Sequence, residues 1–107
     1  MLKPLIDGII VKSIYVIEDS KVTYSWPTDI LKHRITYFLK KTLKGENRSA
    51  PSCAIILDFK SKTMYFALTR NRSIIVFKLD LSNPLELVFL KIQIILSIVY
   101  PSYKVFN

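Results

Sequence analysis

The chain has very few of the residues from which most enzyme sites are built. Its 107 residues include one cysteine (Cys53), one histidine (His33) and two glycines (Gly8 and Gly45). One thiol cannot form an internal disulfide, and one histidine with one cysteine supplies too few soft ligands for a zinc site. Two isolated glycines exclude the glycine-rich loops that hold phosphate groups. These shortages lead us to expect no enzymatic activity, no metal site and no cofactor.

The two single reactive side chains also have ordinary structural explanations. His33 lies between Lys32 and Arg34 on a predicted helix, and no nucleophile-elbow sequence is present to complete a catalytic triad around it. We interpret His33 as a surface residue. Cys53 lies in the apolar run 52–59, which predicts a small buried core side chain.

Targeting and membrane-spanning segments are not expected either. The N-terminal apolar run is interrupted by Asp7 and ended by Glu18 and Asp19, and no small-residue cleavage site follows it. The last apolar run gives about 16 helical residues before Pro101, fewer than the roughly 20 that a bilayer span needs. We therefore expect a cytoplasmic protein.

Positive charge is abundant. The formal net charge is +8, from 16 Lys and Arg residues against eight Asp and Glu residues. Such a balance favours contact with nucleic acid, with an anionic membrane surface or with acidic partners. Because the basic residues are spread along the chain and not clustered, we favour the interpretation that the charge keeps an apolar surface soluble.

Half of the residues are hydrophobic, enough for a core, and the length predicts a single domain over residues 1–107. Residues rich in Ile and Val predict a strand over 5–17, with Gly8 as a bulge, and alternation predicts its hairpin partner over 21–26. Three further strands are predicted over 52–59, 63–69 and 73–81, joined by short polar turns as an antiparallel meander.

A first helix is predicted between the hairpin and the meander, capped by Thr28 or Asp29 and ended by Gly45. Its predicted buried stripe is made of residues at helical spacing: Leu31, Ile35, Phe38, Leu39 and Thr42.

The second predicted helix, in residues 83–100, is apolar around most of its circumference. Asn83 is the predicted N-cap and Pro84 the first helical residue. Glu86, Gln93 and Ser97 fall on one narrow polar stripe. In so short a chain a sheet covers only one side of such a helix, so another chain is expected to cover part of the rest. The predicted partner interface is Leu87, Leu90, Ile94 and Ile98.

The resulting order is β-β-α-β-β-β-α, which predicts an α+β fold with a five-stranded antiparallel sheet and helices packed on its faces. The strand before the first helix is expected to pair with the strands after it. This order, over residues 5–100, resembles the longin and profilin-like group of small adaptor-type and roadblock-related domains. Residues 6–11 followed by 21–27 are similar to the opening hairpin of such domains. The resemblance implies a non-catalytic platform that forms a homodimer or an adaptor-type complex subunit, often near membranes and GTPases.

Two alternatives remain open. A small basic nucleic-acid-binding protein would use a basic stripe on and beyond the first helix, made of Lys32, Lys40, Lys41, Lys44 and Arg48. Such a protein could also stack bases on exposed strand aromatics, for which the candidates are Tyr15, Tyr24, Trp26, Tyr65 and Phe66.

A Mg²⁺-dependent nuclease would use Asp58 and Lys60, which have the spacing of half a nuclease site, with Asp29 or Asp80 as a second carboxylate. This tripeptide, residues 58–60, is common by chance and ends a predicted strand at a hairpin, so we favour its interpretation as a polar turn.

Overall fold

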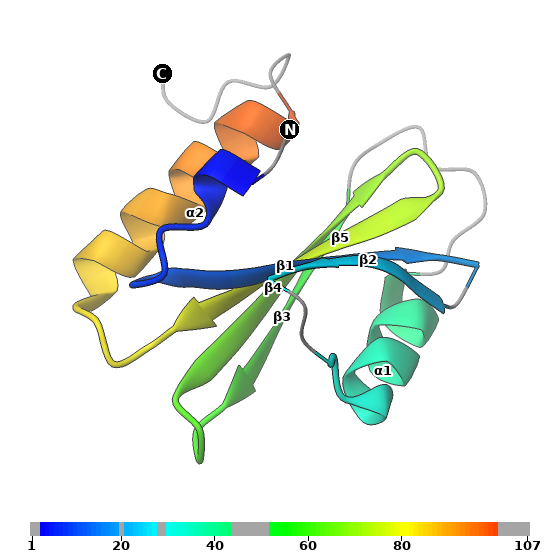
Figure 1. Ribbon diagram of the computed structural model, residues 1–107, viewed down its shortest axis with the longest axis horizontal. Helices are drawn as coiled ribbons and strands as arrows, with labels where there is room; N and C mark the ends of the chain where they lie inside the picture. The colour runs from blue at the N-terminus through cyan, green and yellow to red at the C-terminus, as the bar shows by residue number, and fades with distance from the viewer. Residues whose placement is uncertain (1–2, 20, 28–29, 44–51, 101–107) are drawn as a thin grey trace.

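The computed structural model describes residues 3–19, 21–27, 30–43 and 52–100. They form a five-stranded antiparallel sheet with a helix on each side (Figure 1). This confirms the predicted α+β class. In chain order the elements are a 3-10 helix η1 (Lys3–Leu5), β1 (Val11–Glu18), β2 (Lys21–Trp26), α1 (His33–Leu43), β3 (Cys53–Asp58), β4 (Thr63–Arg70), β5 (Ser73–Asp80) and α2 (Leu85–Val99).

The strand order in the sheet is β2-β1-β5-β4-β3, and every neighbouring pair is antiparallel. The expected pairing of the strand before α1 with the later strands is wrong, because among the described strands β2 pairs with β1 alone and β1 makes the link to β5. The reason lies in composition. The apolar strands β1 and β5 are buried on both faces, whereas the more polar β2 is exposed along most of its length and forms an edge.

Two cores lie on the two faces of the sheet. On one face, here the α2 face, Val88, Ile95 and Val99 of α2 pack against the sheet. On the other, the α1 face, the helix contributes Ile35, Leu39 and Leu43. Strand β4 supplies both cores by simple alternation, with Met64, Phe66 and Leu68 on the α2 face and Tyr65 and Ala67 on the α1 face. This double burial explains why the central strands read as continuous apolar runs.

The first strand begins at Val11, six residues later than predicted. The carboxylate of Asp7 accepts hydrogen bonds from the backbone N–H groups of Ile9, Ile10 and Val11 at 2.9, 2.8 and 2.9 Å. Gly8 adopts a φ of 73°, which lets the chain turn around this carboxylate. A side chain therefore satisfies the N–H groups that strand pairing would otherwise have used.

Helix α1 begins at His33, and the predicted caps Thr28 and Asp29 and the predicted stop Gly45 lie outside the described residues. The predicted burial of Phe38 and Thr42 is wrong, because both are exposed and Leu43 completes the buried stripe instead. Leu43 follows Leu39 by four residues, so it continues the helical row that faces the sheet.

The second helix ends within one residue of its prediction, but its predicted cap is wrong. Pro84 occupies the N-cap with an extended ψ of 137° and no side-chain cap bond. The side-chain Nδ2 of Asn83 instead donates hydrogen bonds to the backbone carbonyl oxygens of Ile9 at 2.9 Å and Asp80 at 3.1 Å. Asn83 thus ties the start of α2 to the N-terminal segment. Cys53 is exposed, contrary to its predicted burial, because β3 is an edge strand whose α2 face the helix does not cover.

Candidate functional site

Strand β3 forms one edge of the sheet, and no strand in the described part of the chain pairs with its outer side. Among the described strands β3 pairs with β4 alone, in an unbroken register. The N–H of Thr69 donates to the carbonyl of Ser52 at 2.9 Å, so Ser52 and Thr69 form a hydrogen-bonded pair. This pair determines which β3 residues direct their backbone groups toward β4 and which direct them outward. Antiparallel pairs alternate between hydrogen-bonded and non-bonded positions, so the backbone groups of Cys53, Ile55 and Leu57 face outward. These three residues present a row of donors and acceptors to an incoming strand.

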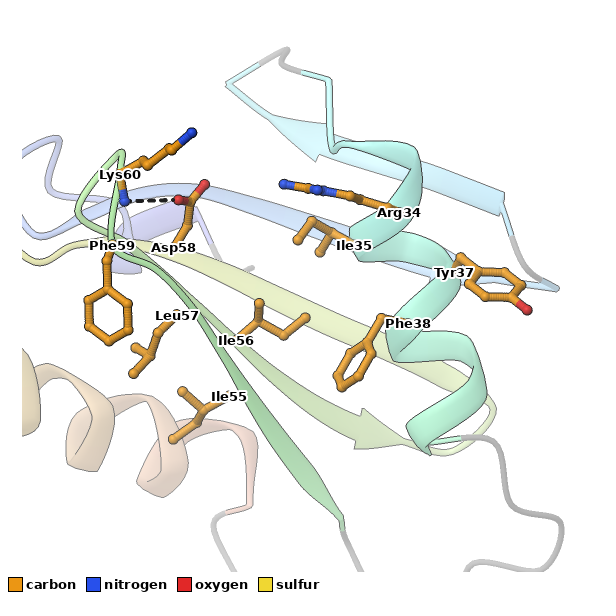
Figure 2. A pocket seen from close by; sticks show the side chains of 10 residues that line it. All are labelled: Arg34, Ile35, Tyr37, Phe38, Ile55, Ile56, Leu57, Asp58, Phe59 and Lys60. Atoms are coloured by element: carbon orange, nitrogen blue, oxygen red, sulfur yellow. Dashed lines mark hydrogen bonds between the residues drawn. The ribbon is translucent and has the colours of Figure 1, made fainter.

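Large apolar side chains flank this edge. Ile55 and Leu57 are opposite Phe66 and Met64, which places them on the α2 face. They are nevertheless 51% and 44% exposed, and Phe59 in the following turn is 77% exposed. Figure 2 shows all three side chains on the same side of β3. This patch lacks the charges and prolines that normally protect an edge strand.

A groove of about 620 Å³ lies along the other side of β3, between this strand and α1. Figure 2 shows Phe38 projecting from α1 toward β3, which explains why this predicted core residue is exposed. The groove continues around the strand edge onto Ile55 and Leu57. Its lining residues are Arg34, Ile35, Tyr37, Phe38, Ile55, Ile56, Leu57, Asp58, Phe59 and Lys60.

The opposite edge, β2, is built differently. A register irregularity between Val16 and Ile17 interrupts its pairing with β1, and Lys21 begins the strand. The hydroxyl of Thr23 donates to a carboxylate oxygen of Glu18 at 3.1 Å, so polar groups and a bulge accompany this edge. Apolar side chains are exposed on both edges, including Val22, Tyr24 and Trp26 on β2, so the unbroken ladder is what distinguishes β3.

Asp58 closes the β3–β4 turn. Its Oδ1 accepts the N–H groups of Lys60 at 3.2 Å and Ser61 at 3.4 Å, and its Oδ2 lies 3.7 Å from the Nζ of Lys32. Hydrogen bonds from the hydroxyl and N–H of Ser61, with the nearby Lys32 charge, hold the pKa of Asp58 below its usual value. Such a carboxylate is occupied with its own turn, as the hairpin interpretation of this tripeptide expects.

The second carboxylate of the nuclease alternative is similarly engaged. Asp80 and Asp58 lie at the same end of the sheet with Thr63 between them, since Thr63 pairs with both. The Oδ1 of Asp80 accepts the N–H of Ser82 at 2.9 Å and its hydroxyl at 2.6 Å. Within residues 3–19, 21–27, 30–43 and 52–100 no three metal-ligating side chains gather, and Asp29 lies outside these ranges.

The predicted partner interface on α2 is exposed to solvent. Leu87, Leu90, Ile94 and Ile98 are between 37% and 48% exposed, although each is a large apolar side chain. Their spacing places them on one stripe of the helix, separated by Lys91 from the side that packs on the sheet. No helix in the described part of the chain has the length and hydropathy to cross a membrane.

The predicted anion-contact residues are only partly brought together. Lys40 and Lys41 are exposed in the last turn of α1, and the Nζ of Lys41 lies 5.4 Å from the ring centre of Tyr37. Lys32 precedes α1 and pairs with Asp58 instead. Lys44 and Arg48 lie outside the described residues. His33 is exposed at the start of α1.

Most of the strand aromatics are not available for base stacking. Tyr15, Tyr65 and Phe66 are at least 96% buried in the two cores. Tyr24 and Trp26 on β2 are 39% and 42% exposed. Three of the five candidate stacking residues therefore lie in the cores, where a base cannot reach them.

Sequence reasoning missed the β3 edge, because its apolar run is equally typical of a central strand. Residues 52–59 alternate between exposed and half-buried side chains. The strand order of the sheet then shows that β3 is an edge strand. A scan against protein-family models finds no match, and a comparison with curated proteins finds no significant relative.

Proposed function

We propose that the protein is a non-catalytic protein-interaction module that acts as a homodimer or as a subunit of an adaptor-type complex. The observation that carries this proposal is the open β3 edge, with its outward backbone groups and its apolar side chains on both faces. Strand addition at such an edge gains affinity from main-chain hydrogen bonds and specificity from the flanking side chains.

A second copy of the chain fits this edge by symmetry. Because Cys53, Ile55 and Leu57 face outward, an antiparallel pair of β3 strands can centre its twofold axis on Ile55. Ile55 then lies opposite Ile55 of the second copy, and Cys53 opposite Leu57. Each of these three positions exchanges two backbone hydrogen bonds with its counterpart. The result is one continuous sheet through both copies.

Charge does not oppose this pairing locally. Asp58 is the one charged residue of β3, and it already has Lys32 beside it. In the register centred on Ile55, Asp58 lies opposite the uncharged Ser52 of the second copy. The net charge of +8 on each chain still repels at long range, so added salt should strengthen the dimer by screening.

The exposed stripe Leu87, Leu90, Ile94 and Ile98 on α2 supports a second contact surface for an adaptor-type partner. A helix face of this kind accepts an apolar groove or another helix. The sheet with one helix on each face also supports the longin or profilin-like assignment, which implies a platform for protein contacts near membranes and GTPases.

Light scattering coupled to size-exclusion chromatography tests self-association at low and high salt. We expect twice the 12.4 kDa mass of the chain, with no loss of dimer in 1 M salt, the condition under which electrostatic nucleic-acid binding fails. A monodisperse monomer at high protein concentration would refute self-association.

Two matched substitutions assign the surface. Ile55→Lys should give a monomer, because it places a charge at the centre of the proposed seam. Ile9→Lys introduces the same charge at another exposed isoleucine and should remain dimeric. If Ile55→Lys stays dimeric while Leu90→Lys becomes monomeric, the α2 stripe is the dimer interface and the β3 assignment is wrong.

Catalysis is tested separately. We expect no cleavage of DNA or RNA by the wild-type protein in the presence of Mg²⁺. Cleavage that is lost in Asp58→Ala would overturn the non-catalytic proposal in favour of the nuclease alternative.

A further inference from the structure

The groove between α1 and β3 has a charged end and an apolar end on both of its walls (Figure 2). On the α1 wall, Arg34 extends toward the turn that follows β3, and Phe38, one helical turn later, projects toward the middle of the strand. On the β3 wall, Asp58 and Lys60 lie at the turn, and Ile55 lies roughly 10 Å back along the strand, at about 3.3 Å per residue. The charged side chains of both walls therefore gather at the same end of the groove.

The charged end keeps two cations available. Its lining holds Arg34 and Lys60 against the single carboxylate of Asp58, which gives a net charge of +1. That carboxylate is already engaged, because its Oδ2 lies 3.7 Å from the Nζ of Lys32 and its Oδ1 accepts two N–H groups of its own turn. Among the described residues, no carboxylate forms an ion pair with Arg34 or Lys60. Both side chains can therefore bind an anion from solution.

The rest of the groove is apolar and has the size of a small-molecule site. Its volume of about 620 Å³ lies within the range of roughly 300–1,000 Å³ that is typical of ligand pockets. Phe38, Ile55 and Leu57 line it and are 49%, 51% and 44% exposed, so an apolar ligand that covers them removes unfavourable contact with water. An elongated apolar body with one negative charge at its end matches both parts of the groove.

We propose that this groove binds a long-chain carboxylate, that is, a fatty acid, with its carboxylate at Arg34 and Lys60 and its alkyl chain between Phe38 and Ile55. The guanidinium of Arg34 is able to form two parallel hydrogen bonds with a carboxylate, and the ammonium of Lys60 adds a point charge. A single negative charge matches the net charge of the lining. Because the groove is formed within one chain, the site does not depend on self-association.

Amide NMR titrations of the full chain with sodium octanoate, sodium decanoate and 1-decanol separate the effects of the charged head and the alkyl chain. We expect saturable shifts with decanoate at the amides of residues 34–38 and 55–60. Octanoate should bind about tenfold more weakly, because it is two methylene groups shorter. Decanol should also bind about tenfold more weakly, because it lacks the charge-assisted hydrogen bonds. Shifts that never saturate with decanoate, or equal affinities for decanoate and decanol, would overturn the proposal.

Two double variants, each of which removes two positive charges from exposed side chains, test the position of the head. Arg34→Gln with Lys60→Gln should weaken decanoate binding about tenfold and change decanol binding less than about twofold. Lys21→Gln with Lys40→Gln, outside the groove, is the matched control and should change the binding of either ligand less than about twofold. Equal weakening of decanoate binding by the two double variants would refute the site.

The position of the alkyl chain is tested by Phe38→Ala. This variant should weaken decanoate and decanol by the same factor, about threefold or more, because both ligands lose the same apolar contact. Unchanged binding of both ligands would contradict the proposed position of the chain.

Light scattering on the same samples keeps this proposal distinct from the proposed dimer. Ile55 and Leu57 belong both to the groove and to the β3 edge, so the molecular mass is measured with and without decanoate. A monomer that binds decanoate supports the ligand site and refutes self-association, whereas a dimer that does not bind decanoate refutes the ligand site alone. Dissociation of the dimer by decanoate supports the site and means that the ligand and the second copy compete for β3.

Discussion

The carboxylate of Asp7 is predicted to make a pH-dependent contribution to folding. It accepts three backbone N–H groups, from Ile9, Ile10 and Val11, and its Oδ2 lies 3.1 Å from the Nζ of Lys91 on α2. Burial alone would raise the pKa of Asp7. The three hydrogen bonds and Lys91 outweigh this effect and lower the pKa from 3.8 to about 2.

A shift of this size corresponds to roughly 2.4 kcal/mol at 1.36 kcal/mol for each pKa unit. Because the carboxylate and Lys91 both keep partial contact with solvent, we reduce the expected value to about 1–2 kcal/mol. A depressed carboxylate pKa stabilises the folded state above the unfolded value of 3.8. That stability is lost as the pH falls from about 4 to about 2.

Urea unfolding of Asp7→Asn and wild type from pH 6 to pH 2 measures this contribution. Asparagine keeps an oxygen acceptor but removes the charge, so the variant should be less stable by about 1–2 kcal/mol at pH 6. The two proteins should converge near pH 2. Asp19→Asn, in the exposed β1–β2 turn, is the matched control and should change stability by less than about 0.5 kcal/mol. A wild-type advantage that persists unchanged at pH 2 would refute the argument.

Three further outcomes follow from the packing and the ladder. Ile56→Pro should destabilise the fold by at least about 1 kcal/mol more than Ile55→Pro in urea unfolding, since only Ile56 turns its N–H toward β4; equal losses would contradict the assigned phase. Phe77→Ala, at a fully buried position, should cost about 3–5 kcal/mol by the same measurement, and a loss under 1 kcal/mol would mean that this core is not formed as described. Lys40→Glu with Lys41→Glu should leave the fold intact and remove any salt-sensitive binding of DNA or anionic vesicles; unchanged binding would exclude α1 as the contact.

The strands were predictable where local chemistry decides them. The bounds of β2 match the prediction, and β3, β4 and β5 differ by one or two residues, because short polar turns such as residues 60–62 end each strand. The start of β1 was not predictable from propensity. Residues 5–10 have strand-forming composition, but one carboxylate, that of Asp7, captures the backbone N–H groups that would otherwise pair.

The exposed edge was hidden for a different reason. Cys53, Ile55 and Phe38 are apolar at positions whose periodicity is correct for a core, so the sequence predicts burial for Cys53 and Phe38. Their exposure depends on where β3 falls in the strand order and on how far each helix reaches over the sheet. Both are properties of the whole fold, and neither is encoded in the residues of β3 or α1 alone.

The difference between the two edges of the sheet limits the size of any assembly built by strand addition. A head-to-tail arrangement, in which β3 of one copy joins β2 of the next, would grow without end. The irregular register and polar groups along β2 oppose that route. The proposed contact of β3 with β3 would use the one regular edge of each copy, so growth by this contact would stop at two chains. If the proposed dimer forms, the difference between the two edges would limit the assembly to two chains and would oppose fibre formation.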